Sequence, residues 1–445
     1  MEQNNKTSIF DKNRILIKGF LIGFLILLML IPKFMVNDVI NERRHYQSEV
    51  VKEVSSKWAG EQVVAGPILV VPYNKHSIAK DGKKVTTKKK VYILPEKLKI
   101  NGEVTTETKK RSIYHVSLYR SDMTLEGNFS SSPIKKLNIN PDDIIWNESR
   151  LVMGISDAKG LEEEVTLDWA DNTSIMEPGI QGAEIFDTEL GANIKLNLET
   201  NSQFNIKLKM KGSSDLQFVP VGKTTDVMLS SNWKDPSFNG YYLPDTNNDT
   251  DGFKAKWRVL HVSRSFPQYW DGYNNKNTNK MYDNSFGVKL IQPADHYAKS
   301  NRSIKYALLI IALTFTVFFF MEVIQKIRIH PLQYILVGMA LIIFYTLLLS
   351  ISEYIGFNSA YMVAAVATVA LIGLYVWSVI KKWKIAIGFT FSLTALYAYL
   401  FMLIQLKEYA LISGSIGLFF VLAIIMYFSR KIDWYSTNKQ IEDHE

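Results

Sequence analysis

Long apolar runs at both ends of this chain enclose a stretch of ordinary soluble composition. One run extends from Ile15 to Val36, and five more follow at residues 304–323, 332–352, 358–380, 385–405 and 410–429. A run of about 20 apolar residues is long enough to cross a bilayer as a helix. The pattern therefore predicts a multi-pass α-helical membrane protein with six spans.

Basic residues near the span ends predict how these helices are oriented. The first run lacks a small-x-small cleavage site, and Lys18 and Lys33 lie at its edges, where long side chains can reach the headgroups. We interpret it as an uncleaved signal anchor. Basic clusters at 326–330, 381–384 and 430–435 fall on one side of the membrane. By the positive-inside rule, both termini should be cytoplasmic and the large middle segment should lie outside.

The middle segment begins with a helical pattern and continues with a strand pattern. Tyr46, Val50, Val54 and Trp58 are spaced as one stripe of an amphipathic helix. From Val63 the period changes to two, as in the series Ile194, Leu196, Leu198 and the series Phe204, Ile206, Leu208, Met210. Turn pairs such as Asp81-Gly82, Asn101-Gly102 and Asp251-Gly252 separate the runs. We predict a large all-β domain, antiparallel and sandwich-like, between the first two spans.

These patterns divide the chain into five segments. We expect a cytoplasmic N-terminus and anchor at 1–36, a juxtamembrane amphipathic helix at 37–62 and a periplasmic β domain at 63–302. A five-span membrane domain at 303–429 and a cytoplasmic tail at 430–445 follow.

Composition removes several classes of chemistry. The chain has no cysteine, so disulfides, thiolate metal sites and cysteine nucleophiles are excluded. Its seven histidines are scattered without metal-ligand spacing, and no nucleophile elbow, P-loop or dinucleotide fingerprint occurs. We therefore predict no catalytic residue, metal or cofactor, and a protein that is not an enzyme. The net charge of +8 is interpreted as topology and lipid contact, not nucleic-acid binding.

One loop resembles a calcium site without completing its pattern. The stretch "PDTNNDTDG" places Asp245, Asn247, Asp249 and Asp251 two residues apart. However, Thr250 stands where the loop needs glycine, and Lys256 where it needs glutamate. The pattern favours a solvated loop.

Two surface patterns are candidates for binding. The stretch "AKDGKKVTTKKK" is typical of a soluble hairpin with protective lysines, and it also suits anionic headgroups or an envelope polymer. The run "NWKDPSFNGYYLP" carries aromatic rings that can stack on a sugar or pack in a core, and packing is favoured. The candidate surface residues are Lys83, Lys84, Lys88, Lys89, Lys90, Trp233, Phe238, Tyr241 and Tyr242.

Charged residues at the span ends are the remaining candidates. Intramembrane carboxylates are functional hypotheses by default, and Glu322 and Glu353 end successive spans. A helix of this length separates them by roughly 30 Å, which excludes an acid–base pair. His330 lies at the same end as Glu322 and can pair with it. We favour structural end-capping for Glu322, His330, Glu353 and Tyr354.

Several stretches together resemble one family, the CreD-type inner-membrane proteins. They run in family order from the anchor to the fourth span, and they include "VINERRHYQSEVVKEVSSKWAGEQVVAGPILVVPY", "LQFVPVGKTTDVMLSSNWKDPSFNGYYLP", "SRSFPQ" and "IHPLQYILVGMALIIFYTLLLSISEYIGFNSAYMVAA". The resemblance implies a bacterial inner-membrane protein with a periplasmic domain, linked to envelope integrity or stress. The family pattern commonly reads Ser-Glu-His where this chain has Ser352-Glu353-Tyr354.

Three functional hypotheses follow. The first is a non-enzymatic envelope-integrity protein whose β domain binds an envelope component or a partner protein. The second is a membrane-embedded enzyme or carrier that uses Glu322, His330 or Glu353. The third is a regulatory partner of an envelope-stress sensor. The expected partners are the lipid bilayer and an envelope polymer, anionic lipid or membrane protein.

Overall fold

The computed structural model describes residues 14–78, 84–179, 185–196, 202–249, 251–290, 295–325, 327–406 and 409–430. The chain forms two compact units. Residues 1–47 and 294–445 make the helical unit, and residues 48–293 make the β unit.

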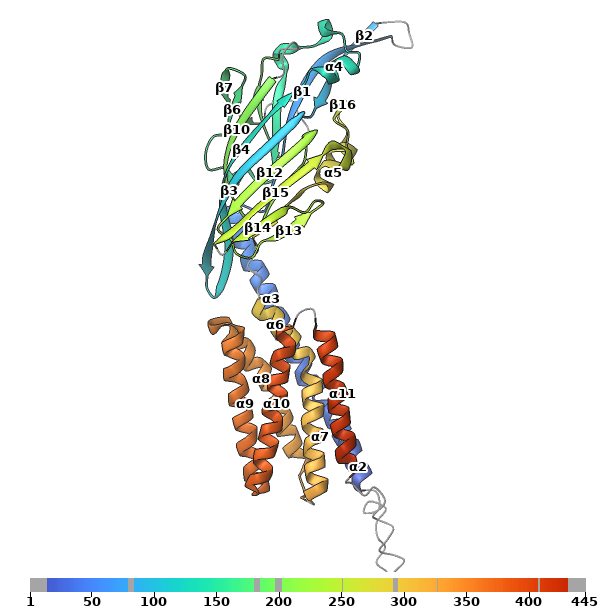
Figure 1. Ribbon diagram of the computed structural model, residues 1–445, viewed down its shortest axis with the longest axis vertical. Coiled ribbons are helices and arrows are strands. Elements are labelled where there is room, and N and C mark those ends of the chain that lie inside the picture. Colours follow the sequence, from blue (N-terminus) through green and yellow to red (C-terminus); the bar gives the residue numbers. More distant parts are fainter. Residues whose placement is uncertain are drawn as a thin grey trace, which may run out of the picture. The chain divides into compact units, whose positions relative to one another are not determined.

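The helical unit contains long apolar helices from both ends of the chain (Figure 1). They are α2 Arg14–Leu28, the part of α3 Leu30–Trp58 up to Gln47, α7 Ala307–Gln325, α8 Pro331–Ile355, α9 Phe357–Ile380, α10 Trp383–Gln405 and α11 Ala410–Ser429, with a shorter α6 Asp295–Lys305 before α7. Within the described residues, five segments are long and apolar enough to cross a membrane: one in the α2–α3 stretch, and α7, α8, α9 and α10. The apolar part of α11, Ile412–Tyr427, is shorter, so the sixth span stays a prediction.

Interlocking aromatic rings hold the centre of this bundle. Phe344 of α8 lies 5.4 Å from the ring centroid of Tyr361 on α9 and 4.7 Å from that of Tyr397 on α10. Edge-to-face contacts of this kind add to the gain from burial. Gly356 alone separates α8 from α9, with φ of +78°, a conformation that glycine adopts without strain. The short connection therefore packs the two helices as neighbours.

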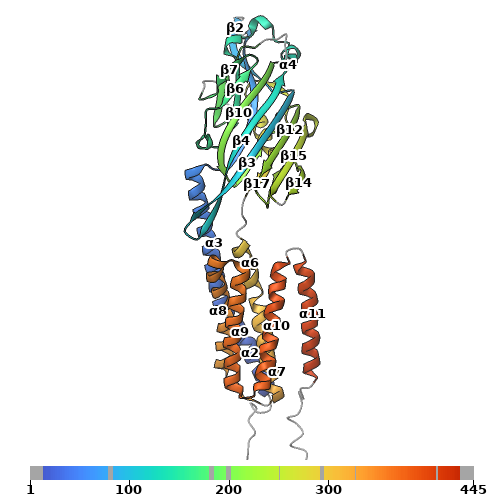
Figure 2. The same cartoon turned by 60° about the vertical axis from the view of Figure 1, so that its left-hand side comes forward.

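The β unit is built from two sheets that share one hydrophobic core (Figure 2). The nine-stranded sheet has the order β13-β17-β11-β1-β5-β9-β8, with β2 paired to β1 and β16 to β2; the eight-stranded sheet has the order β14-β15-β12-β3-β4-β10-β6-β7. The strands are β1 Gln62–Ile78, β2 Lys84–Ile93, β3 Lys97–Arg111, β4 Tyr114–Phe129, β5 Arg150–Ile155, β6 Thr166–Trp169, β7 Asn172–Ile175, β8 Glu177–Pro178, β9 Glu189–Asn193, β10 Ser202–Ser213, β11 Asp215–Phe218, β12 Thr224–Ser231, β13 Ser237–Gly240, β14 Asp245–Asp249, β15 Gly252–Leu260, β16 Tyr269–Asp271 and β17 Phe286–Lys289.

The period-two pattern predicts many of the inward-facing positions. In β10 the side chains of Phe204, Ile206, Leu208 and Met210 are all buried, as alternation predicts. Ile194 and Leu196 instead follow the end of β9, and Leu198 lies outside the described residues. Asn101-Gly102 lies inside β3 and not at a turn, whereas Asp251-Gly252 separates β14 from β15. Asp81-Gly82 lies outside the described residues.

The sheets are mixed, which corrects the antiparallel prediction. β1 pairs with β11 in parallel, and β12 pairs with β3 in parallel, while the other pairings are antiparallel. Alternation of polar and apolar residues fixes which face a side chain takes, but it carries no information about the direction of the neighbouring strand. Short helices α4 Ser132–Lys136 and α5 Asn275–Asp283 lie in connections of this unit.

The last part of α3, from Ser48, belongs to the β unit, and the residues after it make a tight set of contacts there. The backbone N–H of Gly60 donates to the Asp157 carboxylate at 3.0 Å. The side-chain amide of Gln62 donates to the carbonyls of Asp157 and Lys211. The helix runs without a break from Leu30 to Trp58, so the sequence boundary drawn at residue 36 does not correspond to a helix end.

Candidate functional site

Glu322 is the most enclosed carboxylate among the described residues of the helical unit. It lies near the end of α7, is 5% exposed and forms an ion pair with Lys18 of α2. It also accepts hydrogen bonds from the backbone N–H of Ile329 at 3.0 Å and from the Tyr334 hydroxyl at 3.1 Å. Its charge is therefore neutralised and its oxygens are occupied. This contact joins α2 to α7 and to the start of α8.

The partner of Glu322 was missed by the sequence interpretation. Lys18 was assigned to the lipid headgroups, whereas its ammonium donates to Glu322 and, at 3.4 Å, to the Ile329 carbonyl. The two residues are 304 positions apart. No local pattern encodes such a contact. A weak signal was present, because a lysine at the edge of an apolar run is costly unless it reaches water or a counter-ion.

His330 has a capping role in this structure. Its ring Nδ1 accepts a hydrogen bond from the backbone N–H of Leu332 at 3.2 Å. Its backbone N–H donates to the side-chain oxygen of Gln333 at 3.0 Å. Pro331 occupies the first turn of α8, where its missing N–H costs nothing. These contacts cap the N-terminus of α8 and occupy the Nδ1 atom of His330.

Glu353 lies at the opposite end of α8 from the Glu322 contact. Tyr297 of α6 donates its hydroxyl to Glu353 at 2.8 Å, and Tyr297 is buried. Tyr334, which contacts Glu322, is 19 residues earlier on α8, a rise of about 28 Å. Tyr354 is 76% exposed. The structure does not bring Glu322, His330 and Glu353 together into one site.

The lysine-rich hairpin forms an arm whose far part is exposed. Strands β1 and β2 pair in register as far as Ile78↔Lys84, and residues 75–78 and 84–88 are all exposed. We call these nine residues, together with Lys89 next to them, the basic arm. Lys84 and Lys88 belong to it, and Lys88 pairs with Glu148. Lys89 and Lys90 are half-buried at its base, and Lys83 lies outside the described residues.

The aromatic run serves mainly as core. The ring of Phe238 lies 5.5 Å from Phe253 and 5.7 Å from Trp257, and Tyr242 packs on Phe286. Trp233 is half-buried and donates its indole N–H to the Asp235 carbonyl. Tyr241 is exposed.

The calcium-like segment is a strand and not the predicted loop. Asp245–Asp249 forms β14, whose residues pair with β15 in the register Asp245↔Lys256. Among the residues that the structure describes, no group of three histidines or carboxylates is placed to hold a metal ion.

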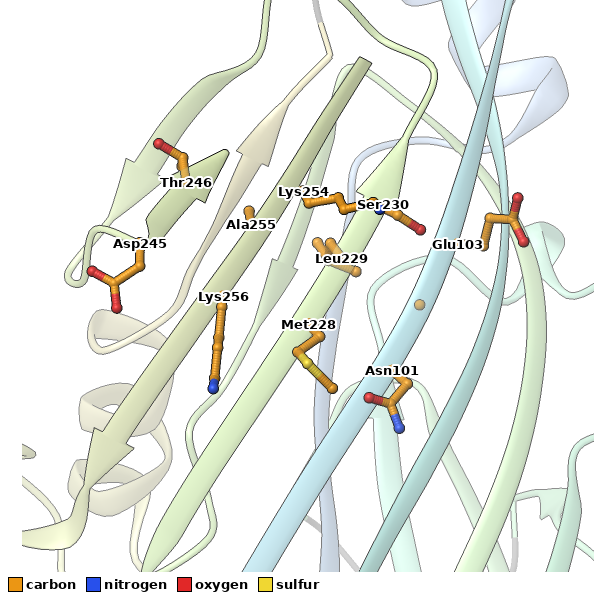
Figure 3. Close-up of a pocket in the computed structure, with 11 residues that line it drawn as sticks. Asn101, Glu103, Met228, Leu229, Ser230, Asp245, Thr246, Lys254, Ala255 and Lys256 are labelled. Atoms are coloured by element: carbon orange, nitrogen blue, oxygen red, sulfur yellow. The ribbon is translucent and has the colours of Figure 1, made fainter. Parts of the chain in front are cut away.

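Beside β14 lies a groove that the sequence interpretation did not identify (Figure 3). It has a volume of about 540 Å³ and crosses the outer face of the eight-stranded sheet from β14 to β3. Asp245 and Glu103 stand on opposite sides, with Met228 between them (Figure 3). Its lining residues are Asn101, Gly102, Glu103, Met228, Leu229, Ser230, Asp245, Thr246, Lys254, Ala255 and Lys256.

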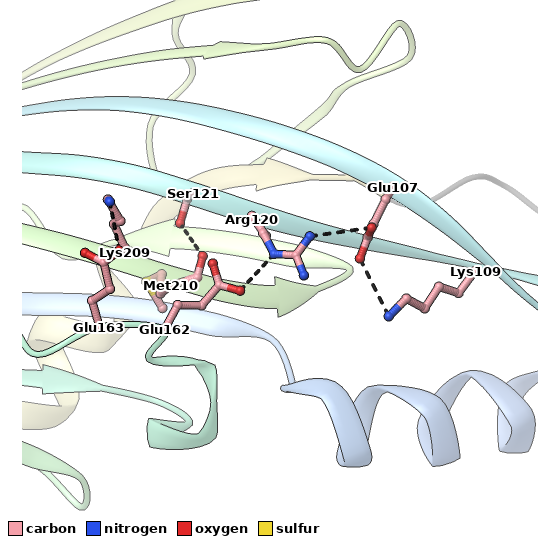
Figure 4. A network of polar contacts seen from close by, with 8 residues as sticks. All are labelled: Glu107, Lys109, Arg120, Ser121, Glu162, Glu163, Lys209 and Met210. Atoms are coloured by element: carbon pink, nitrogen blue, oxygen red, sulfur yellow. Dashed lines mark hydrogen bonds and ion pairs between the residues drawn. The ribbon is translucent and has the colours of Figure 1, made fainter.

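A second charged cluster surrounds the end of α3. Lys109, Lys211 and Arg120 lie 3.6, 4.7 and 5.0 Å from the Trp58 ring. Arg120 also pairs with Glu162 at 2.8 Å and with Glu107 at 3.6 Å (Figure 4). The hydrogen bond to Glu162 raises the pKa of Arg120. Carboxylates pair with Arg120 and Lys109, and Lys211 lies over the Trp58 ring, so this cluster anchors the end of the helix.

A family model and a curated relative each match nearly the whole chain. The sequence model described as "Inner membrane protein CreD" matches residues 14–435. The chain belongs to the CreD family. Inner membrane protein CreD of Escherichia coli strain K12 is 32% identical over 422 residues, which cover 92% of each chain. The protein is thus an inner membrane protein with several membrane-spanning helices and a large mixed β-sheet unit.

One solved structure, a mutant M1 zinc metallopeptidase from Deinococcus radiodurans, aligns at 10% identity with a TM-score of 0.20. The alignment covers 40% of this chain and 42% of that one. A score this low carries no argument about the CreD-family chain.

The stretch "SRSFPQ", one of those that resemble the CreD family, holds several connections of the β unit together. The guanidinium of Arg264 is 8% exposed and donates to the carbonyls of Pro220 and Val221 at 3.0 and 2.6 Å, and to the Gln268 side chain. Gln268 in turn donates to the carbonyls of Leu94 and Pro95. Burial lowers the pKa of Arg264 to about 10. The motif joins three connections by satisfying their buried carbonyls.

Proposed function

We propose that this inner-membrane protein supports the integrity of the cell envelope without catalysing a reaction. In this proposal both termini are cytoplasmic, the first span is an uncleaved anchor, and the β unit is periplasmic. The β unit binds an anionic envelope polymer through its basic arm. The observation that carries the proposal is the placement of ammonium groups on both faces of that arm.

Strand register decides which lysines share a face. The pairs Asn74↔Lys88 and Ile78↔Lys84 put Lys84 and Lys88 on one face, because side chains alternate along a strand. The pairs Lys75↔Thr87 and Tyr73↔Lys89 put Lys75 and Lys89 on the other. A flat bilayer surface can meet only one face of such an arm. A flexible polyanion can meet both, which favours a polymer over a lipid surface.

The contacts of the membrane candidates support a role without catalysis. Glu322 is neutralised by Lys18, His330 caps α8, and Glu353 accepts from Tyr297 at the far end of that helix. An intramembrane enzyme or carrier needs such groups to converge on one water-accessible cavity. Their separation along α8 argues against that hypothesis.

Co-sedimentation of the full-length protein with isolated cell-wall sacculi tests the proposal. The variant Lys75→Gln/Lys84→Gln/Lys88→Gln/Lys89→Gln should lose most of the bound fraction. Binding by the wild-type protein should fall as salt is raised, because exposed charges are screened within about 10 Å at 0.1 M salt.

A matched control removes four exposed lysines elsewhere on the β unit: Lys135, Lys136, Lys159 and Lys195, each changed to Gln. This control variant has the same net charge as the arm variant, and it should bind as the wild-type protein does. Equal binding by the arm variant would contradict the proposed contact. Stronger binding to anionic lipid vesicles than to sacculi would contradict the choice of a polymer.

A further inference from the structure

We infer that the groove between β14 and β3 is a binding site for a short zwitterionic peptide, separate from the basic arm. The observations that lead to this ligand are the register of the strands, the unpaired charges and the composition of the lining.

Strand register arranges the polar lining in two rows. Asp245, Lys256, Met228 and Asn101 are direct partners on four adjacent strands and form the first row. Lys254, Ser230 and Glu103 form the second row, two residues further along. Residues two apart point to the same face of a sheet, so both rows project into the groove.

The charged groups of these rows lack partners. No ion pair or hydrogen bond joins the side chains of Asp245, Lys256, Lys254 or Glu103 to another residue within the described part of the chain. The adjacent row behaves differently, because Arg258 and Asp226 pair at 2.7 Å. This ion pair lies next to the groove, whereas the four charged groups of the groove make no such contact within the described residues.

The signs of these charges select the class of ligand. Two ammonium groups, of Lys254 and Lys256, lie between two carboxylates, of Asp245 and Glu103 (Figure 3). A polyanion would meet both carboxylates, and a polycation would meet both ammonium groups. A ligand with a central carboxylate and amines on either side complements all four, because opposite charges attract and like charges repel.

The uncharged lining favours a peptide over a sugar. Aromatic rings are absent from the described lining residues, and such rings are the preferred surface for the apolar face of a sugar. The groove instead offers Met228, which is 39% exposed and whose flexible thioether adapts to varied aliphatic groups. Asn101 and Ser230 supply the neutral donors and acceptors that amide groups need.

The dimensions set the length of the peptide. Three strand spacings of about 4.8 Å separate β14 from β3, which makes roughly 14 Å. An extended chain advances about 3.4 Å per residue, so about four residues span the groove. The volume of about 540 Å³ lies within the usual range for small-ligand sites.

Isothermal titration of the full-length protein in detergent tests this site. The probe is the tetrapeptide Ala-Glu-Lys-Ala with free termini. A second probe is the same peptide with its amines acetylated and its carboxylates amidated. We expect the blocked peptide to bind at least tenfold more weakly, because it loses the hydrogen bonds between charged groups.

Variants assign the binding to the groove. Lys254→Gln/Lys256→Gln should weaken binding of the zwitterionic peptide at least tenfold, and Asp245→Asn should weaken it without affecting the blocked peptide. The control Lys135→Gln/Lys136→Gln on α4 and the four-lysine arm variant should bind the peptide normally. Circular dichroism should show an unchanged fold in each variant.

Three results would overturn the inference. They are equal binding of the free and blocked peptides, unchanged binding by the Lys254→Gln/Lys256→Gln variant, and tighter binding of chitotetraose or polyglutamate than of the tetrapeptide. Because the arm variant is measured in the same series, failure of the groove and failure of the arm are distinguished.

Discussion

Glu189 is held where its protonated form is favoured. It begins β9 and is half-buried. Burial raises the pKa of its carboxyl to about 7, although the backbone N–H groups of Ile185 and Phe186 and the charge of Arg150 act in the opposite direction. The group therefore changes its charge near neutral pH, well above the ordinary range of a glutamate.

This shift predicts how stability depends on pH. The folded state holds the proton more tightly than the unfolded state does, so the contribution of Glu189 is fully present below pH 4.5 and is lost as the pH rises through about 7. Glu189→Gln should reduce the loss of stability of the β unit between pH 5 and pH 8 by about 1 to 2 kcal/mol, after discounting for partial exposure. Thermal unfolding of the wild-type protein and the variant, monitored by tryptophan fluorescence at each pH, measures this difference in stability.

Comparing the wild-type protein with the Glu189→Gln variant at each pH isolates the effect of Glu189. Burial also raises the pKa of Asp215, but Asp215 is present in both proteins. An unchanged pH profile in the Glu189→Gln variant would show that this carboxyl does not titrate as described.

At the scale of elements, the contact between Lys18 and Glu322 fastens α2 to the rest of the helical unit. Removing one member of a buried ion pair leaves an uncompensated charge and typically costs several kcal/mol, whereas replacing both members is much less costly. Glutamine at position 322 keeps an oxygen that can accept from Ile329 and Tyr334. The pair can therefore be tested with two variants. One leaves the charge of Glu322 without a partner, and the other removes the charges of both residues.

We predict that Lys18→Met alone destabilises the protein by roughly 3 kcal/mol, and that Lys18→Met/Glu322→Gln recovers most of this loss. The thermal midpoint of the detergent-solubilised protein, read by size-exclusion chromatography, measures both. Similar midpoints for the single variant and the wild type would mean that Glu322 is not held as a buried carboxylate.

Local sequence patterns predicted helices and strands, but they did not predict which segments distant in the sequence pair with each other. Helix and strand periods identified the apolar spans and the inward face of β10, because these depend on neighbouring residues. The parallel pairs of β1 with β11 and of β12 with β3 depend on how crossovers are arranged. The contact of Lys18 with Glu322 joins opposite ends of the chain. Neither leaves a periodic signal in the sequence.

The groove was hidden for a related reason. Asp245 was noticed for a calcium-like spacing along the chain, whereas its neighbours in space are Lys256 on the next strand and Met228 beyond it. The site is perpendicular to the strands. A pattern read along the sequence could therefore name Asp245 and Lys256, but it could not group them with Met228 and Glu103.

At the scale of the whole molecule, the candidate binding surfaces and the candidate charges of the membrane helices fall in different units. The basic arm and the groove belong to the β unit, and the engaged charges Lys18, Glu322 and Glu353 belong to the helical unit. The CreD-family chain is thus interpreted as a membrane-held binding module. Its function should depend on exposed lysines more than on intramembrane carboxylates.

Complementation of a strain that lacks this protein tests that claim most directly. The measurement is restored resistance to detergent, with the amount of each variant in the membrane matched by immunoblot. The account predicts that Lys18→Met/Glu322→Gln/Glu353→Gln restores resistance and that Lys75→Gln/Lys84→Gln/Lys88→Gln/Lys89→Gln does not. Restoration by the arm variant, together with failure of the membrane variant at equal abundance, would contradict it.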